Sequence, residues 1–253
     1  MTRINLNCDM GESFGRYALG DDAGLLRWVT SANVACGMHA GDPLVMERTV
    51  RMAVERGVEI GAHPGYPDLQ GFGRRDMAFA SDEVEAMVLY QVGALAGFLR
   101  AFNVELVHVK PHGALYNQAA KDRALAAAIA RGTARFSRNL ILVGLAGSQL
   151  LAAGTEAGLR VASEGFPDRS YNPDGSLRSR REPGAVLESV DEVCEQALRL
   201  AREGAGQGSN KVPVDTLCIH GDNPNAAVLA QAVRKTLEES GIRVDRLSEM
   251  FRL

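Results

Sequence analysis

The chain has 253 residues and a formal net charge of −3, from 28 basic and 31 acidic side chains. Apolar residues make up 46% and charged residues 23%, which is ordinary for a folded globular protein and argues against intrinsic disorder. Because a basic excess is missing and aromatic residues amount to only 6%, we expect no nucleic-acid partner.

The beginning of the chain shows no sign of a secretory signal, because it lacks an apolar core and acidic residues occur early. The longest uncharged stretch, residues 140–155, is shorter than the about 20 apolar residues of a membrane span. We therefore expect a soluble cytoplasmic protein with no membrane partner. The four cysteines form no CxxC pair, and we expect Cys8, Cys36 and Cys218 to be small buried side chains.

Short β-prone runs alternate with amphipathic helical segments along the chain. The expected strands are 4–8, 31–36, 58–62, 104–109, 140–144, 159–163 and 216–219, with a weaker run at 242–247. Helices are expected between Asp42 and Gly57, over 82–102 after a Ser81 cap, over 190–203 after a Ser189 cap, and over 225–239.

This alternation predicts a parallel sheet of the α/β class. Seven or eight units in a chain of this length favour a TIM-like (β/α) barrel, with an open doubly wound sheet as the alternative. No linker divides the sequence, so we expect one barrel domain over residues 1–253.

Polar side chains gather where the expected strands end, and in a barrel these ends meet at one mouth. Four of the five histidines lie just past strand ends, whereas His108 lies inside a strand. The rim histidines are His39, His63, His112 and His220, and the same rim holds Asp9, Glu12, Asp42, Lys110, Glu164 and Asp222. Imidazoles with carboxylates suit general acid–base catalysis or activation of water.

The same donor types also suit a metal ion with mixed nitrogen and oxygen ligands. Asp9, His39 and His63 come from the first three strand ends and would form a three-ligand site with an open position. His108 and His112 are too far apart along an extended segment to share an ion easily.

Two loops, 64–80 and 165–185, are longer than a barrel requires and are rich in arginine. Their guanidinium groups suit an anionic substrate, although solvated charge is the alternative. Lys110 precedes a proline, which holds its backbone in an extended conformation. Its side chain is either solvated or a partner for a carboxylate or an oxyanion. The chain contains neither a P-loop nor a GxGxxG or GxSxG motif, so no familiar nucleotide site or serine nucleophile is present.

Several blocks of sequence resemble, in order, those of the LamB/YcsF family. They lie at 4–12, 31–42, 63–75, 109–117, 168–171, 183–186 and 218–222. The block at 63–75 departs at Gly65, where a serine is expected. The resemblance implies a distorted (β/α) barrel of seven strands, related to glycoside hydrolase and deacetylase barrels.

The resemblance also implies one component of an ATP-dependent 5-oxoprolinase, which hydrolyses 5-oxo-L-proline to L-glutamate while ATP becomes ADP and phosphate. Two further subunits that resemble the halves of allophanate hydrolase are implied as partners. Because no P-loop is present, we expect Mg-ATP to be bound with the partner subunits.

Phosphorylation of the amide oxygen would activate the lactam, and water would then need a base. The catalytic candidates are Asp9, Glu12, His39, His63, Lys110 and His112. The substrate-binding candidates are Arg75, Arg169, Tyr171, Arg180, His220 and Asp222. The alternatives are a stand-alone, metal-dependent deacetylase-like hydrolase and a non-catalytic subunit that binds substrate for its partners.

Overall fold

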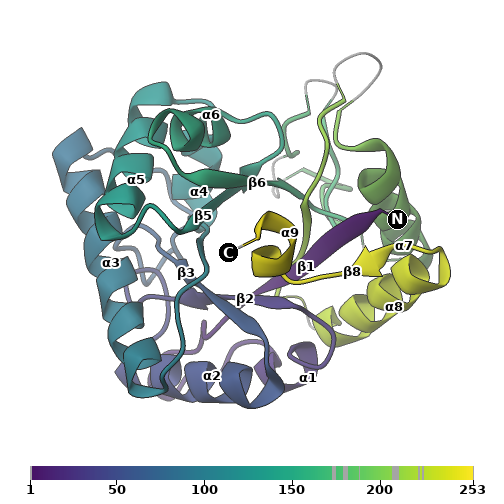
Figure 1. Ribbon diagram of the computed structural model, residues 1–253, viewed down its shortest axis with the longest axis horizontal. Coiled ribbons are helices and arrows are strands. Elements are labelled where there is room, and N and C mark those ends of the chain that lie inside the picture. Colours follow the sequence, from purple (N-terminus) through teal and green to yellow (C-terminus); the bar gives the residue numbers. More distant parts are fainter. Residues whose placement is uncertain are drawn as a thin grey trace.

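Parallel strands close into a barrel in the computed structural model, which describes residues 2–172, 175–178, 182–187, 189–206, 211–221, 223 and 225–252 (Figure 1). Within these residues the barrel has seven strands, each paired with the next in sequence, and β1 pairs with both β2 and β7. They are β1 (Arg3–Met10), β2 (Ser31–Ala35), β3 (Glu59–His63), β4 (His108–Val109), β5 (Ile141–Leu145), β6 (Arg160–Gly165) and β7 (Thr216–Ile219). The predicted seven-stranded barrel is confirmed, and the open sheet is excluded.

A ring of helices surrounds the strands (Figure 1). The helices are α1 (Asp22–Leu25), α2 (Pro43–Arg56), α3 (Ser81–Ala101), α4 (Gly113–Ala119), α5 (Arg123–Phe136), α6 (Gln149–Glu156), α7 (Val190–Glu203), α8 (Ala226–Glu239) and α9 (Leu247–Phe251). Helix α2 begins and ends as expected, because the Asp42 carboxylate accepts hydrogen bonds from the first turn and Gly57 ends the helix with φ +64°.

Two local predictions need correction, and a third is confirmed in position. The strand expected at 104–109 shortens to β4, because only His108 and Val109 pair in register with both β3 and β5. Ala80, rather than Ser81, caps α3, and the Glu83 carboxylate accepts the Ala80 N–H. Ser189 does occupy the cap position of α7, although its side chain makes no capping hydrogen bond to the described residues.

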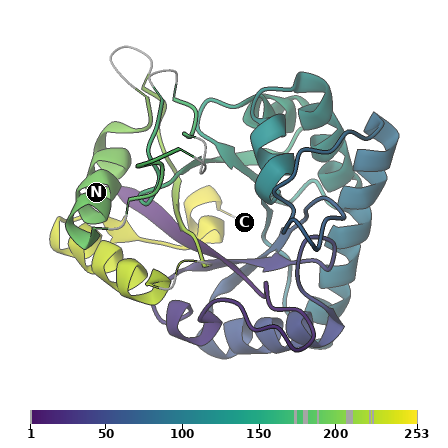
Figure 2. The same cartoon turned by 180° about the vertical axis from the view of Figure 1, so that it is seen from behind.

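The weak strand expected at 242–247 is largely wrong, since it divides into β8 (Arg243–Val244) and the start of α9. Strand β8 pairs with the beginning of β1. Helix α9 lies across the middle of the barrel (Figures 1 and 2), where Leu247 packs against Ile141, Val143 and Ala162. This apolar plug closes the amino-terminal end of the barrel.

The interior of the barrel near β1 is polar. Ile4, Leu6, Cys8 and Met10 belong to the apolar core, whereas the alternate residues Asn5, Asn7 and Asp9 bond side chains of other strands. Because side chains alternate between the two faces of a strand, one short sequence supplies both an apolar outer face and a polar inner face.

Helix α3 is the one helix in the described part of the chain whose length and composition would allow it to cross a membrane. This is weak evidence for a span, because core helices of water-soluble proteins pass the same test. Here α3 buries Val84, Val88, Val92 and Leu95 in the apolar core around the barrel.

Candidate active site

A cavity of about 1180 Å³ lies at the carboxyl end of the strands. Both long loops contribute to its wall, Arg74 from the first, Arg169 and Arg178 from the second, so they share one face as expected. The strand ends add Asp9, His63, Lys110, His112 and His220 to the same wall. The polar residues that the sequence placed at the strand ends therefore meet in one concave site.

Lys110 is the centre of one half of this site. Its side chain comes from the end of β4 and is only 3% exposed. The Nζ atom lies 3.0 Å from Asp9 Oδ1, 3.0 Å from Glu164 Oε1 and 2.9 Å from Cys218 Sγ. One buried ammonium group thus holds together strands β1, β6 and β7.

Neighbouring amide and hydroxyl groups complete the contacts of the two carboxylates. Asn33 Nδ2 donates to Asp9 Oδ1 at 2.8 Å, and Asn7 Nδ2 donates to Glu164 Oε1 at 2.9 Å. The Tyr116 hydroxyl donates to Glu164 Oε2 at 2.7 Å. We call this set the lysine network; it consists of Asn7, Asp9, Asn33, Lys110, Tyr116, Glu164 and Cys218.

Mutual charge fixes the protonation states in the lysine network. Burial alone would raise the pKa of Asp9, but nearby positive charge, including the Lys110 ammonium, holds it well below its usual range. Burial alone would lower the pKa of Lys110, but the charges of Asp9 and Glu164 hold it well above its usual range. Burial and the Asp9 charge raise the pKa of the Cys218 thiol well above normal. The network therefore contains an ionised Asp9, an ammonium group and a neutral thiol.

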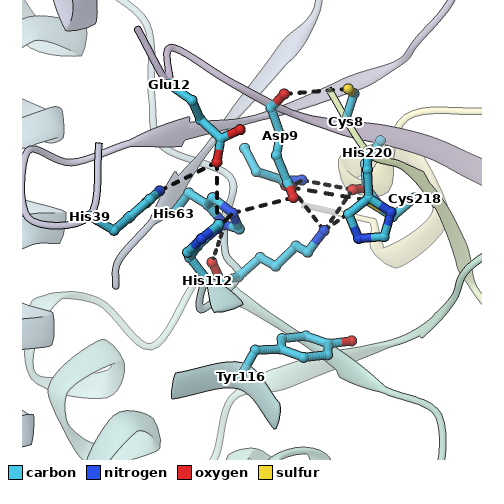
Figure 3. A network of polar contacts seen from close by, with 12 residues as sticks. Cys8, Asp9, Glu12, His39, His63, His112, Tyr116, Cys218 and His220 are labelled. Carbon is cyan, nitrogen blue, oxygen red and sulfur yellow. Dashed lines mark hydrogen bonds and ion pairs between the residues drawn. The ribbon is translucent and has the colours of Figure 1, made fainter. Parts of the chain in front are cut away.

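The other half of the site is a histidine cluster, which we define as Glu12, His39, His63 and His112. One potential ligand atom from each lies within 4.8 Å of the others, and all four residues are buried (Figure 3). Glu12 reaches the histidine cluster because Gly11, at φ +68°, turns the chain at the end of β1.

The distances in the histidine cluster are short and involve ring nitrogens. His63 Nε2 lies 2.9 Å from His112 Nδ1, while Glu12 Oε1 lies 3.4 Å from His39 Nε2 and 3.5 Å from His112 Nδ1. The His39 and His112 rings stack with their centroids 3.8 Å apart. Burial lowers the pKa of both His39 and His112 well below the usual value, so these rings are neutral.

Only some of the expected substrate-binding residues lie on the cavity wall. Arg169 is buried on the cavity wall and donates to the carbonyls of Ala185 and Arg178. Arg75 pairs with Asp68, its side chain is 61% exposed, and it lies outside the cavity wall formed by the described residues. His220 lines the cavity, with Nδ1 2.8 Å from Asp168 Oδ2.

Tyr171 supports the second loop, since its hydroxyl accepts a hydrogen bond from the Phe166 N–H. The remaining two candidates, Arg180 and Asp222, lie outside the described residues.

Several members of the lysine network were absent from the site residues expected from the sequence. Cys218 was expected to be only a small buried side chain, and Asn7 and Asn33 had no expected role. The polar alternation of Asn5, Asn7 and Asp9 in an otherwise apolar run is the signal that could have identified Asn7. Ser31 and Asn33 alternate with Ala32 and Val34 in the same way, so this signal could have identified Asn33 too. The strand of Cys218 shows no such alternation, and only its contact with Lys110 reveals its place.

The sequence profile of the LamB/YcsF family matches residues 4–252. The chain belongs to this family. Two LamB/YcsF relatives, each named as the A subunit of 5-oxoprolinase, come from Methylococcus capsulatus and Bacillus subtilis. The first is 57% identical over 96% of this chain and 95% of its own length. The second is 52% identical over 98% of each chain.

A solved structure shows the same architecture. The lactam utilization protein from Thermus thermophilus is 46% identical and covers 97% of this chain and 100% of its own, with a TM-score of 0.90. The Bc1960 peptidoglycan N-acetylglucosamine deacetylase reaches a TM-score of 0.51 at 13% identity over 99% of this chain and 88% of its own. The second similarity concerns the fold alone.

Proposed function

We propose that this chain is the A subunit of an ATP-dependent 5-oxoprolinase, a hydrolase that opens the lactam ring of 5-oxo-L-proline to give L-glutamate. Relatives with this name match nearly the whole chain at about half identity. The single structural observation that carries the proposal is the Asp9–Lys110 ion pair, 3.0 Å between Oδ1 and Nζ, on the wall of the cavity.

Ring opening requires water to add to the carbonyl carbon and the carbon–nitrogen bond to break, with a proton delivered to nitrogen. An amide is a poor electrophile, so transfer of the terminal phosphoryl group of ATP to the amide oxygen would make the carbon reactive. Cleavage of the carbon–nitrogen bond then leaves an acyl phosphate, which a second water molecule hydrolyses to glutamate and phosphate. Overall, ATP and two water molecules are consumed, and ADP, phosphate and glutamate are released. We place Mg-ATP with two partner subunits that resemble the halves of allophanate hydrolase, in a cytoplasmic complex.

Asp9 is the base in this proposal. Its ionised carboxylate lines the cavity, and the contacts with Lys110 and Asn33 fix one of its oxygens, Oδ1. The other oxygen can then accept the proton of the attacking water. The Lys110 ammonium holds the base in place and offers positive charge to the oxygen that becomes negative in the transition state.

The arginines of the two long loops suit the charges of this substrate. Arg74, Arg169 and Arg178 line the cavity, where they can face the carboxylate of 5-oxoproline or an attached phosphoryl group. The cavity also exceeds the about 300–1,000 Å³ usual for small ligands, so it has room for the phosphorylated intermediate. The anionic groups of the substrate would thus be held at the rim, while the reacting carbonyl lies over Asp9.

The test compares Asp9→Asn with a matched control, Asp215→Asn, in the assembled complex with Mg-ATP. Asp215 bonds the Ser163 N–H and is absent from the cavity wall of the described residues. We expect glutamate release by Asp9→Asn to fall by about 10²–10⁴-fold, the usual contribution of a general base. The control should retain its activity.

Wild-type turnover by a folded Asp9→Asn complex would exclude Asp9 as the base. Turnover by the isolated chain without ATP would instead favour the stand-alone hydrolase. If the chain binds 5-oxoproline and substitutions of Asp9 and Lys110 leave turnover of the complex unchanged, the subunit only delivers substrate to its partners.

A further inference from the structure

Two imidazole nitrogens face each other in the histidine cluster, one from His63 and one from His112. His63 Nδ1 lies 2.7 Å from the Lys110 carbonyl oxygen, and His112 Nε2 lies 2.8 Å from the Phe72 carbonyl oxygen. A carbonyl only accepts hydrogen bonds, so these two nitrogens carry the ring protons. In neutral rings the opposite nitrogens, His63 Nε2 and His112 Nδ1, then direct lone pairs at each other across 2.9 Å.

A third imidazole joins the same point. His39 is 1% exposed, and neither of its ring nitrogens forms a hydrogen bond with any residue that the structure describes. Its Nε2 lies 3.4 Å from Glu12 Oε1, which is also 3.5 Å from His112 Nδ1. Lone pairs of neutral imidazoles that face one another in a buried site repel each other unless positive charge lies between them.

We propose that Glu12, His39, His63 and His112 together bind one divalent transition-metal ion. Ligands of a tetrahedral zinc ion, at bond lengths of about 2.0–2.1 Å, lie about 3.3 Å apart. The distances of 2.9, 3.4 and 3.5 Å between donor atoms are close to this value. An imidazole-rich set suits zinc and similar ions, whereas magnesium and calcium prefer oxygen ligands.

The backbone contacts of the two rings support the same assignment. Histidines that bind metals usually donate the second ring N–H to a carbonyl or carboxylate, which fixes the free nitrogen toward the ion. His63 and His112 do this with the carbonyls of Lys110 and Phe72. The ligand orientation is therefore set by the polypeptide backbone before any ion arrives.

The carboxylate ligand differs from the Asp9 expected from the sequence. Asp9 Oδ1 is engaged by Lys110 and Asn33, and Oδ2 lies 3.4 Å from His63 Nε2. Asp9 therefore stands beside the ion rather than among its ligands. His63 and His112 line the cavity whereas Glu12 and His39 are absent from its described wall, which places the ion at the edge of the cavity.

The test measures metal directly, in the full chain without a histidine tag and without reference to lactam hydrolysis. Purified wild-type protein should contain about one zinc ion or similar ion per chain by mass spectrometry. After chelation, added Co²⁺ should give the intense visible absorption of a low-symmetry site. The dissociation constant for Zn²⁺ should rise by more than about 100-fold in His39→Gln and in Glu12→Gln. Loss of a residue that only hydrogen-bonds a metal ligand already weakens metal affinity by about 10–100-fold.

His220→Gln is the matched control, because His220 also lies at the cavity but bonds Asp168 instead of the cluster. It should keep the metal content of the wild type. Circular dichroism must show that each variant is folded.

Folded wild-type protein that binds neither Zn²⁺ nor Co²⁺ would overturn the proposal, and a proton shared between His63 and His112 would then supply the charge. Equal binding by wild type and His39→Gln would overturn it as well. Because the readout is metal content, failure here leaves the 5-oxoprolinase proposal untouched.

Discussion

The lysine network and the histidine cluster lie side by side at the same end of the barrel, joined by the 3.4 Å contact between Asp9 and His63, yet they are built differently (Figure 3). In the lysine network, donors meet acceptors and the ammonium group meets two carboxylates at 3.0 Å. In the histidine cluster, acceptor nitrogens meet one another. The charges of the first region are balanced within the polypeptide, whereas the proposed metal ion would balance the second.

The largest expected effect comes from removing the charge at the centre of the lysine network. Lys110→Met leaves the Asp9 and Glu164 carboxylates buried without their counter-charge, which should lower the free energy of unfolding by about 3–5 kcal/mol. Urea unfolding measures this change. Lys235→Met, at an exposed position of α8, is the control and should stay within about 0.5 kcal/mol. A stable Lys110→Met protein would show that the network is not held by this charge.

Zinc binding should distinguish the histidine cluster from the lysine network most clearly. At a zinc concentration about 100 times the dissociation constant, binding should raise the free energy of unfolding of wild type by about 2.7 kcal/mol. His39→Gln should lose nearly all of this increase, while in metal-free protein it should cost only about 1 kcal/mol, because the ring makes no hydrogen bond to the described residues. An equal loss with and without zinc would mean that His39 acts only through packing.

A smaller effect is expected at the edge of the lysine network. Tyr116→Phe removes the hydroxyl that donates to Glu164 Oε2 and should lower the free energy of unfolding by about 2 kcal/mol, as for other hydrogen bonds to charged groups. Tyr90→Phe, on an exposed side chain, provides the comparison. Zinc affinity should remain that of wild type, and a coupled loss of zinc would show that the two regions are not independent.

The smallest effect is expected for Cys218→Ala, which removes the thiol beside Lys110 Nζ. The loss should be about 1 kcal/mol in unfolding free energy, because the ammonium keeps both carboxylates. Glutamate release should continue, since the raised pKa of this thiol leaves little thiolate for nucleophilic attack. Abolished turnover in a folded Cys218→Ala complex would contradict this and give Cys218 a chemical role.

Much of the architecture can be predicted from the residues alone. Alternation of apolar strands with capped helices predicts the barrel, because each such unit can bury its apolar face only against its neighbours. It also places His63, Lys110 and His112 at one mouth, since the ends of parallel strands in a barrel must meet.

Pairing between individual side chains could not be predicted in the same way. Glu12 and His112 are a hundred residues apart, and nothing in the local pattern says that one carboxylate oxygen lies 3.5 Å from that ring. The turn at Gly11 and the register of β1 beside β2 decide that Asp9 contacts Lys110 while Glu12 lies among the histidines.

The order of the strands and helices, and the kinds of polar group at their ends, thus follow from patterns within short stretches of the chain. Only the folded barrel determines which of these polar groups contact one another. Strand periodicity is a local property, whereas the hydrogen bonds of Lys110 and the facing ring nitrogens of His63 and His112 arise from contacts between different strands and loops of the barrel.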